Sequence, residues 1–285
     1  MPALNDWRDA AERQLKSAGI PSARLDAELI LTHTIKKPRT YLHAHPDAEI
    51  DSRTHEILNA RLDLRLDRVP LAYIIGHKEF YGRRFRVDST TLIPRPESEA
   101  LIEILKTLTP AEPPLDSRLA PKIVDVGTGS GILGITAKLE RPHCEVVLLD
   151  VSRPALNVAA KNATNLGAEV QIIKSDLLSD YPYTADIMLA NLPYVDESWH
   201  NSPELQHEPS LALYASDGGL KLIKKLLEAA PLRLTKTGIV ILEADRRQHQ
   251  AIIDFAAKLG YQKRARTGLA LALQFSPATP DTNPA

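Results

Sequence analysis

Four residues suited to holding a small planar group follow a short apolar run. The run, residues 185–190, is typical of a buried strand, and Asn191-Leu192-Pro193-Tyr194 comes directly after it. In an open α/β sheet, ligands bind outside the carboxyl ends of the strands. There the Asn191 side chain, the Leu192 carbonyl and the Tyr194 ring can hold one flat polar group. The alternative is an ordinary strand-to-loop turn, because Asn and Pro are common turn residues.

A glycine-rich loop follows an earlier predicted strand, residues 122–126, which contains Asp125. The loop reads Gly127-Thr128-Gly129-Ser130-Gly131. Glycines let the backbone turn tightly and approach a ligand, and the next helix presents its N-terminus there. A G-x-G-x-x-G pattern also starts at Gly129, but it is out of register for the dinucleotide fingerprint. The glycine pattern alone is therefore weak evidence for any one ligand.

An acidic residue strengthens the case for a nucleoside. Asp150 ends the second predicted strand, about 20 residues after the loop, where a carboxylate can hold a ribose diol. The alternative role is a helix N-cap, which Ser152 can also fill. Asp176 and Leu177 follow the third strand, where a polar and an apolar group can border an adenine ring. We therefore expect a nucleoside site beside the Asn191 clamp.

Two enzyme classes differ in what they need from this pair of sites. An NAD enzyme needs a nicotinamide pocket in the second half of the sheet and has no use for Asn-x-Pro-Tyr. A methyltransferase needs S-adenosylmethionine at the first half of the sheet and a nitrogen acceptor at the fourth strand. The sequence supplies both of these, so it favours a methyltransferase.

The elements that must position these residues fall into two regions. Residues 1–70 are predicted to be helical, with Asn5 or Asp6 as the first N-cap, Ser22 and Asp51 as later ones, and a stripe of apolar residues on residues 51–69. We expect these helices to form a small bundle. Four histidines there (His33, His43, His45 and His55) lack a consistent ligand spacing, so no metal site is expected.

A hairpin is predicted to link this bundle to the sheet. Residues 73–76 and 85–87 are strand-like and flank the plausible turn Tyr81-Gly82, so residues 71–93 form the expected linker. The methyltransferase domain is then expected over residues 94–275. It opens with a rigid Pro-containing segment in which Arg95 and Glu97 can contact a ligand, and Ser98 can cap the next helix.

Strands and helices alternate from residue 122 onwards, which predicts a parallel, doubly wound sheet. Strand-like segments 261–265 and 269–275 surround Thr267-Gly268 and add an antiparallel hairpin. The tail, residues 276–285, is rich in Pro and Thr and is expected to be disordered.

Composition bounds the function. The chain has 285 residues, a formal net charge of -1 and one cysteine, Cys144, so neither a disulfide within the chain nor a cysteine metal site is expected. The near-neutral charge argues against tight non-specific nucleic-acid binding. Neither a signal peptide nor a membrane span is evident, so we expect a cytoplasmic protein without membrane contact.

The chain resembles the HemK/PrmC-type protein-(glutamine-N5) methyltransferases over nearly its whole length. Motifs in order carry the resemblance: the hairpin segments 71–76 and 79–82, residues 93–99 against I-P-R-P-E-T-E, residues 125–131 against D-x-G-T-G-S-G, and Asp150-Val151-Ser152. Later elements are Glu208-Pro209, residues 217–220, Glu243 and Gln248. The family has Asn-Pro-Pro-Tyr where this chain has Leu192 in the second position, which keeps the carbonyl but loses the proline ring that fixes φ.

This resemblance implies a Rossmann-like class I methyltransferase with a small N-terminal helical domain. It implies S-adenosylmethionine as cofactor and class I peptide chain release factors as partners, modified on the glutamine of their Gly-Gly-Gln motif. We expect the protein itself to be a monomer. The implied catalytic and substrate-binding residues are Asn191, Leu192, Pro193 and Tyr194, with Arg95 and Glu97 as further substrate contacts. The implied cofactor site comprises Asp125, Gly127, Thr128, Gly129, Ser130, Gly131, Asp150, Val151, Asp176, Leu177 and Asn191.

Three alternatives stay open on the sequence alone. An adenine nucleic-acid methyltransferase can use the same clamp for an exocyclic amine, although the charge of the chain disfavours it. A glutamine methyltransferase of a ribosomal protein is a closer rival, but the Ile93–Glu97 run resembles the release-factor enzymes better. A binding protein that has lost turnover is the third.

Overall fold

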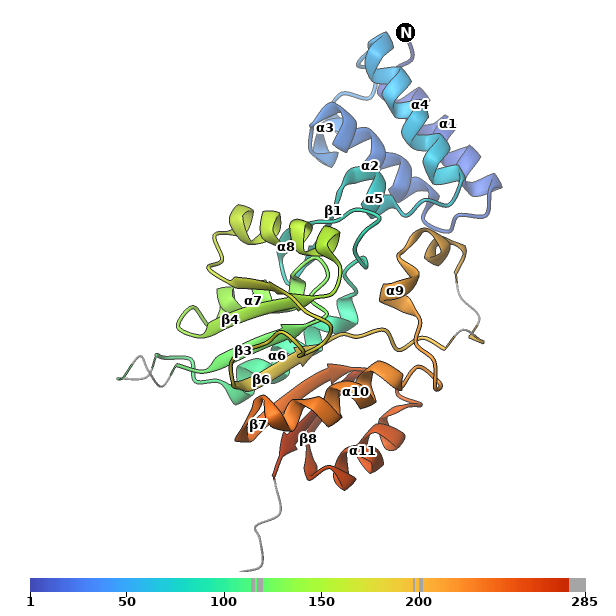
Figure 1. The fold of residues 1–285 in the computed structure, drawn as a ribbon. Helices are drawn as coiled ribbons and strands as arrows, with labels where there is room; N and C mark the ends of the chain where they lie inside the picture. The colour runs from blue at the N-terminus through green and yellow to red at the C-terminus, as the bar shows by residue number, and fades with distance from the viewer. Residues whose placement is uncertain (114–115, 117–119, 197, 200–201, 277–285) are drawn as a thin grey trace, which may run out of the picture. The chain divides into compact units, whose positions relative to one another are not determined.

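The chain divides into two compact units. The computed structural model describes residues 1–113, 116, 120–196, 198–199 and 202–276 (Figure 1). Unit 1 comprises Met1–His77 together with Asn201–His207, and unit 2 comprises Lys78–His200 and Glu208–Ala285. The expected tail lies, from residue 277 onwards, outside the described residues.

Unit 1 is a helical bundle, as predicted. Its helices are α1 (Leu4–Ser17), α2 (Ala23–Ile35), α3 (Arg39–Ala44), α4 (Ser52–Leu66) and α5 (Leu71–Ile75). Asp51 caps α4 by accepting a hydrogen bond from the Thr54 N–H at 2.9 Å. Neither Asn5 nor Asp6 caps α1, because that helix already begins at Leu4, whose N–H donates to the Ala48 carbonyl.

A short segment from far along the chain also belongs to unit 1. The 3-10 turn η3 (Pro203–His207) places Glu204 3.3 Å from the Arg65 guanidinium. Arg65 is buried and also pairs with the buried Asp26 at 2.7 Å. His207 lies 3.0 Å from the Asp67 carbonyl. Residues 203–207 are therefore held by the Arg65 side chain of α4 and by the backbone at the end of α4.

The expected strand at residues 73–76 is wrong, because these residues form α5. Pro70 precedes this helix, and Gly76 ends it in the left-handed region with φ 73°. Gly commonly ends helices in this conformation, whereas a short apolar run fits a helix or a strand equally well. The hairpin itself is present: β1 (His77–Phe80) and β2 (Arg83–Arg86) flank Tyr81-Gly82.

A seven-stranded sheet forms the centre of unit 2, as predicted. The strands are β3 (Lys122–Val126), β4 (Glu145–Asp150), β5 (Gln171–Lys174), β6 (Ala185–Ala190), β7 (Leu234–Glu243), β8 (Tyr261–Thr267) and β9 (Ala270–Phe275). Their order is β5-β4-β3-β6-β7-β9-β8. The first five are parallel, and β9 and β8 join as an antiparallel hairpin. Strand order reverses between β3 and β6, which is where a doubly wound sheet binds its ligand.

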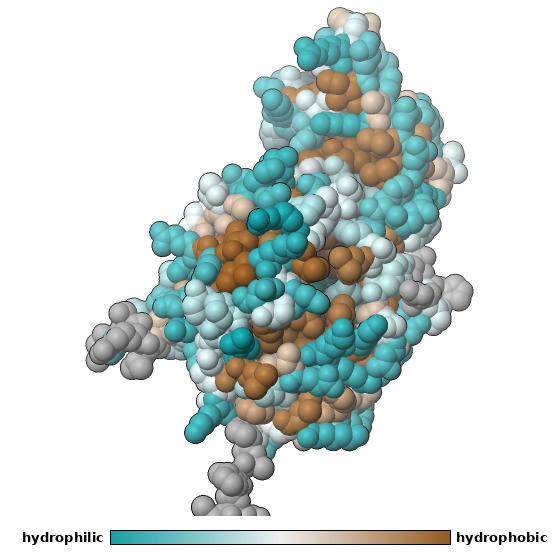
Figure 2. Space-filling view, in the orientation of Figure 1, coloured by the Kyte–Doolittle hydropathy of each residue, from teal (hydrophilic) through white to brown (hydrophobic). Residues whose placement is uncertain are grey.

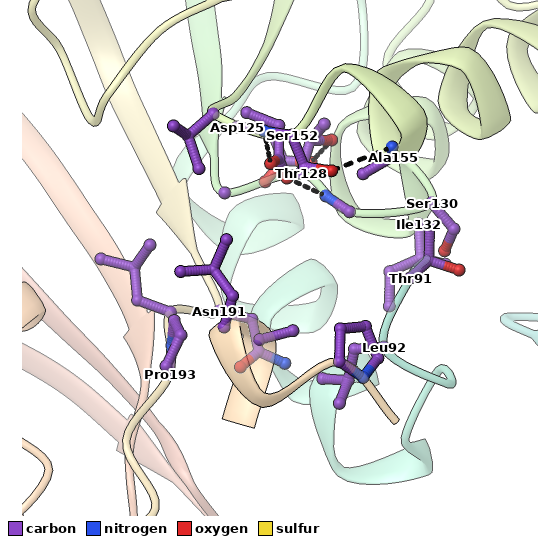
Figure 3. Close-up of a pocket in the computed structure, with 18 of the residues that line it drawn as sticks. Thr91, Leu92, Asp125, Thr128, Ser130, Ile132, Ser152, Ala155, Asn191 and Pro193 are labelled. Carbon is purple, nitrogen blue, oxygen red and sulfur yellow. Dashed lines mark hydrogen bonds between the residues drawn. The ribbon is translucent and has the colours of Figure 1, made fainter. Parts of the chain in front are cut away.

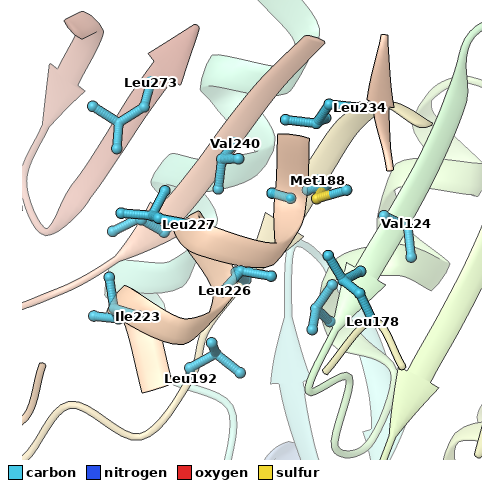
Figure 4. Close-up of a cluster of buried hydrophobic side chains, with 14 of the residues drawn as sticks. Val124, Leu178, Met188, Leu192, Ile223, Leu226, Leu227, Leu234, Val240 and Leu273 are labelled. Atoms are coloured by element: carbon cyan, nitrogen blue, oxygen red, sulfur yellow. The ribbon is translucent and has the colours of Figure 1, made fainter. Parts of the chain in front are cut away.

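Helices cover both faces of this sheet (Figure 1). One face packs on α10 (Lys221–Ala229) and α11 (His249–Lys258), and Figure 4 shows part of this core, including Val124, Met188 and Val240. The other face packs on α6 (Glu99–Leu108), α7 (Ile132–Glu140) and α8 (Arg153–Leu166). Other short elements in the described part of the chain are η1 (Pro96–Ser98), α9 (Ser210–Leu213) and η4 (Ala230–Leu232). Alternate residues of each strand face opposite layers, so both faces are apolar.

Candidate active site

A pocket lies at the carboxyl ends of the parallel strands in unit 2. We call it the glycine-loop pocket, and its walls include segments 90–95, 127–130, 150–152, 175–177 and 191–193. In Figure 3 the residues Asp125, Thr128 and Ser152 lie on one side of it, and Asn191 and Pro193 lie on the other. The structure thus brings the glycine loop and the Asn191 segment, which are 60 residues apart, to one cavity.

The glycine loop is shaped around the Asp125 carboxylate. Asp125 Oδ2 accepts hydrogen bonds from Thr128 Oγ1 at 2.6 Å and from the Gly134 N–H at 2.9 Å. Asp125 Oδ1 is buried and has no hydrogen-bond partner among the described residues. Burial raises the pKa of Asp125 from 3.8 to about 6. The loop backbone has positive φ at Gly127 (72°) and Gly129 (55°), which glycine adopts without strain.

Asp150 lies between the glycine loop and α8. Its Oδ2 accepts from the Gly129 N–H at 2.8 Å, and its Oδ1 accepts from the Ser152 N–H at 2.8 Å. The helix cap is Ser152, whose Oγ accepts from the Ala155 N–H at 3.3 Å (Figure 3). Burial raises the pKa of Asp150. Because Ser152 caps the helix, the Asp150 carboxylate is left to shape the pocket wall.

The Asn191 amide belongs to a chain of hydrogen bonds that starts at the end of β7. Glu243 is buried, and its Oε2 accepts from Ser98 Oγ at 2.6 Å while its Oε1 accepts from the Tyr194 hydroxyl at 2.9 Å. Asn191 Nδ2 donates to Ser98 Oγ at 3.0 Å. Burial raises the pKa of Glu243, and the bonds from Ser98 and Tyr194 oppose that rise. Ser98 precedes α6, and the expectation that its side chain caps this helix is wrong, because it makes no capping hydrogen bond.

A second buried glutamate holds the Pro-containing segment at the pocket. Glu208 Oε1 accepts from Arg95 Nη2 at 2.5 Å, and Glu208 Oε2 accepts from the Ile93 N–H at 3.0 Å. The Glu208 side chain is only 2% exposed, whereas that of Arg95 is 34% exposed. Glu208 therefore fixes both the backbone and the Arg95 side chain of the segment that lines one wall.

The loop after β6 is fixed from behind by Gln248. Its Nε2 donates to the carbonyls of Tyr194 at 2.8 Å and Gly218 at 2.7 Å, and its Oε1 accepts from the Asp245 N–H at 3.0 Å. Gly219 allows this approach, because a Cβ there would lie 2.0 Å from the Tyr194 carbonyl oxygen.

Comparisons with known proteins agree with this architecture. The PrmC N-terminal domain matches residues 6–76, and the methyltransferase small domain matches residues 98–208. A release factor glutamine methyltransferase of Koribacter versatilis is 36% identical over 240 residues, which cover 82% of this chain and 84% of that protein. Another, of Deinococcus radiodurans, is 32% identical over 269 residues, which cover 93% and 94%.

The chain belongs to the release factor glutamine methyltransferase family. Among solved structures, a methyltransferase from Pyrococcus furiosus superimposes with a TM-score of 0.53 at 18% identity, covering 80% of this chain and all of that one, and it supports the fold alone. Among the described residues, none of the helices combines the length and apolar character that a bilayer span needs.

The departure from the family pattern at Leu192 is buried. Leu192 is 4% exposed and shares a core cluster with Ile223 and Leu226 of α10 (Figure 4). A Cβ at Gly127 would lie 2.8 Å from Leu192 Cδ2, so the side chain also packs against the glycine loop. Leu192 thus links the clamp segment to the cofactor loop by apolar packing.

Most of the predicted site residues of this family line the glycine-loop pocket, but three do not. Gly131, Tyr194 and Glu97 lie outside its lining, and Glu97 is exposed. Tyr194 instead bonds Glu243 through its hydroxyl.

Sequence reasoning gave no role to several residues that shape this pocket. Thr91, Ser175 and Leu211 line it, and Glu208 holds one wall. The Glu208-Pro209 pair was the available signal for that wall, since it matched a family element without an assigned role.

Proposed function

We propose that this protein transfers a methyl group from S-adenosylmethionine to the side-chain amide nitrogen of the glutamine in the Gly-Gly-Gln motif of class I peptide chain release factors. One observation carries the proposal. In a chain of this family, the Asn191 amide lies in the glycine-loop pocket with its Nδ2 engaged by Ser98, which leaves Oδ1 able to accept a hydrogen bond from a substrate amide.

The pocket suits S-adenosylmethionine. Asp125 Oδ1 is buried without a partner among the described residues, and a carboxylate oxygen of this kind suits the ammonium group of a methionine moiety. Asp150 supplies a carboxylate at the position expected for a ribose diol. Val151, next to Asp150 in the chain, is 46% exposed, and Leu177 also lines the pocket. Both side chains can therefore border an adenine ring.

Asn191 and Leu192 would act on the acceptor nitrogen. When bound, S-adenosylmethionine supplies an electrophilic methyl group on a positively charged sulfur. An amide nitrogen is a poor nucleophile because its lone pair is delocalised into the carbonyl. Asn191 Oδ1 and the Leu192 carbonyl can accept the two N–H groups, which turns the lone pair towards the methyl group and favours the positive charge that develops on nitrogen. Alignment of the reacting atoms supplies much of the rate. The surplus proton on nitrogen then leaves to water.

Unit 1 and the β1–β2 hairpin are proposed to dock the release factor. Figure 2 shows apolar side chains at the surface of the helical unit, and Leu25, Ile57 and Leu64 are each at least 40% exposed there. Exposed apolar side chains mark a protein contact surface where they form a contiguous patch. A free Gly-Gly-Gln peptide should therefore have a higher KM than the whole release factor.

The proposal is tested by Asn191→Ala with a purified release factor, using peptide mass spectrometry. We expect the unchanged protein to add one methyl to the Gly-Gly-Gln glutamine, and the variant to lose at least about 100-fold in turnover while its cofactor Kd stays similar. Asn157→Ala, an exposed asparagine on α8, is the matched control. Near-normal turnover of Asn191→Ala would exclude the clamp. Methylated adenine in a parallel nucleic-acid incubation, without methylglutamine, would replace the proposal with a nucleic-acid activity.

A further inference from the structure

A buried carboxylate lies at the centre of the hydrogen bonds behind the clamp. Glu243 at the end of β7 is 1% exposed, and its oxygens accept the hydroxyls of Ser98 at 2.6 Å and Tyr194 at 2.9 Å. The Asn191 side chain also interacts with Glu243 directly and lowers its pKa. Ser98 Oγ in turn lies 3.0 Å from Asn191 Nδ2. The chain Asn191–Ser98–Glu243 is thus continuous from the pocket wall to the sheet.

The direction of this chain follows from which atoms have protons to give. An ionised carboxylate only accepts hydrogen bonds, and a serine hydroxyl has one proton. Ser98 must therefore donate its proton to Glu243, and it can only accept from Asn191. Asn191 must then present its NH2 group to Ser98, because its carbonyl oxygen would meet lone pairs with no proton between them.

The two ends of an asparagine amide have nearly the same shape, so packing alone cannot distinguish them. For a clamp the difference is decisive. Oδ1 facing the pocket accepts a substrate N–H, whereas Nδ2 facing the pocket repels it. Something other than shape must select the productive orientation.

We propose that Glu243 is a positioning residue, which acts through Ser98 to keep Asn191 Oδ1 turned towards the acceptor amide. This inference rests on the proposed function. Glu243 does not touch the substrate, and both of its oxygens are engaged, so it does not take the proton released from the acceptor nitrogen. Through Tyr194, the same carboxylate holds the other end of the Asn191–Tyr194 segment.

Glu243→Gln tests this role with almost no change in shape. The glutamine NH2 can donate to Ser98, which frees the Ser98 proton for Asn191 Oδ1 and reverses the chain. At about pH 8.5, where an ordinary glutamate is ionised, we expect kcat to fall by about 10- to 100-fold, the effect of losing a hydrogen bond to a charged group. KM for the release factor, the cofactor Kd and Tm should change little. Glu228→Gln, an exposed glutamate on α10, is the matched control.

The middle of the chain is tested by replacing Ser98. Valine and threonine at position 98 have nearly the same shape, but only threonine has a hydroxyl that can accept from Asn191 and donate to Glu243. Ser98→Thr should recover most of the kcat that Ser98→Val loses. Adding Glu243→Gln to Ser98→Val should cost less than Glu243→Gln costs alone, because the route through Ser98 is already broken and only the direct interaction of Glu243 with the Asn191 side chain is left. Losses that multiply in the double variant, or a wild-type kcat in Glu243→Gln, would overturn the proposal.

An NMR measurement separates this inference from the proposed substrate. The Asn191 Nδ2 proton signals, assigned by their loss in Asn191→Ala, should shift in both Glu243→Gln and Ser98→Val in the absence of any substrate. Such shifts, in a protein that fails to methylate release factors, would retain the positioning role and reject the substrate. Unshifted signals in Glu243→Gln would reject the positioning role whatever the substrate.

Discussion

Asp125→Asn should change how the stability of unit 2 depends on pH. Burial raises the pKa of Asp125 to about 6 from 3.8, so ionised Asp125 is less favourable in the folded than in the unfolded chain. A shift of about two units corresponds to a cost of about 3 kcal/mol when the group is ionised in both states. The cost is fully present above the folded pKa of about 6 and is relieved as pH falls towards 3.8.

The measurement is guanidinium unfolding without cofactor, for the unchanged protein and the variant, at about pH 7 and about pH 5. At each pH the effects of other groups cancel in the difference between the two proteins. When pH falls from about 7 to about 5, the free energy of unfolding of the unchanged protein should rise by about 1 kcal/mol relative to that of Asp125→Asn. Asp245→Asn is the flat control: the Arg247 bond lowers the pKa of Asp245, so this carboxyl is ionised in the folded and unfolded chain at both pH values and its difference should not change. The reasoning would be refuted if the difference in unfolding free energy between the unchanged protein and Asp125→Asn were the same at both pH values. It would also be refuted if the unchanged protein lost stability relative to the variant at about pH 5.

Two further substitutions test packing around the site. Leu192→Ala should lower the free energy of unfolding by about 3 kcal/mol, because it empties a buried core position. Leu232→Ala, at an 84% exposed position, should change the free energy of unfolding little. Equal effects of the two substitutions in denaturant titrations would contradict this prediction. Gly219→Ala should displace the Tyr194 carbonyl, since the new Cβ would lie 2.0 Å from it, and should lower turnover by about 100-fold. Unchanged kinetics in the glutamine methylation assay would show that this loop can shift at no cost to the reaction.

Local patterns were enough to predict the sheet and the two ligand segments. Short apolar runs that alternate with helical segments indicate parallel strands, and the glycines of residues 127–131 mark the turn after the first. Because parallel strands share one carboxyl edge, strand assignment alone predicts that Asn191 and Asp150 lie near each other.

Contacts between distant residues could not be predicted in this way. Ser98 and Glu243 are 145 residues apart, and Arg95 and Glu208 are 113 apart. No periodicity relates such pairs, and from the sequence alone a helix-cap role, which the structure does not show, was enough to account for Ser98. At residues 71–75 the apolar run was ambiguous, but Pro70 and Gly76 at its ends are the residues that commonly bound a helix.

Unit 1 is built from two separate segments of the chain, and this limits how either unit can be replaced by that of a relative. The chain passes between the units three times, because residues 201–207 return to the helical unit. Cutting the chain after His77 would leave Glu204 behind without Arg65, directly ahead of the Glu208 that holds Arg95. A chimera that takes its helical unit from a relative must therefore take residues 203–207 from the same relative. Otherwise the foreign helices would meet a segment 203–207 that does not match them.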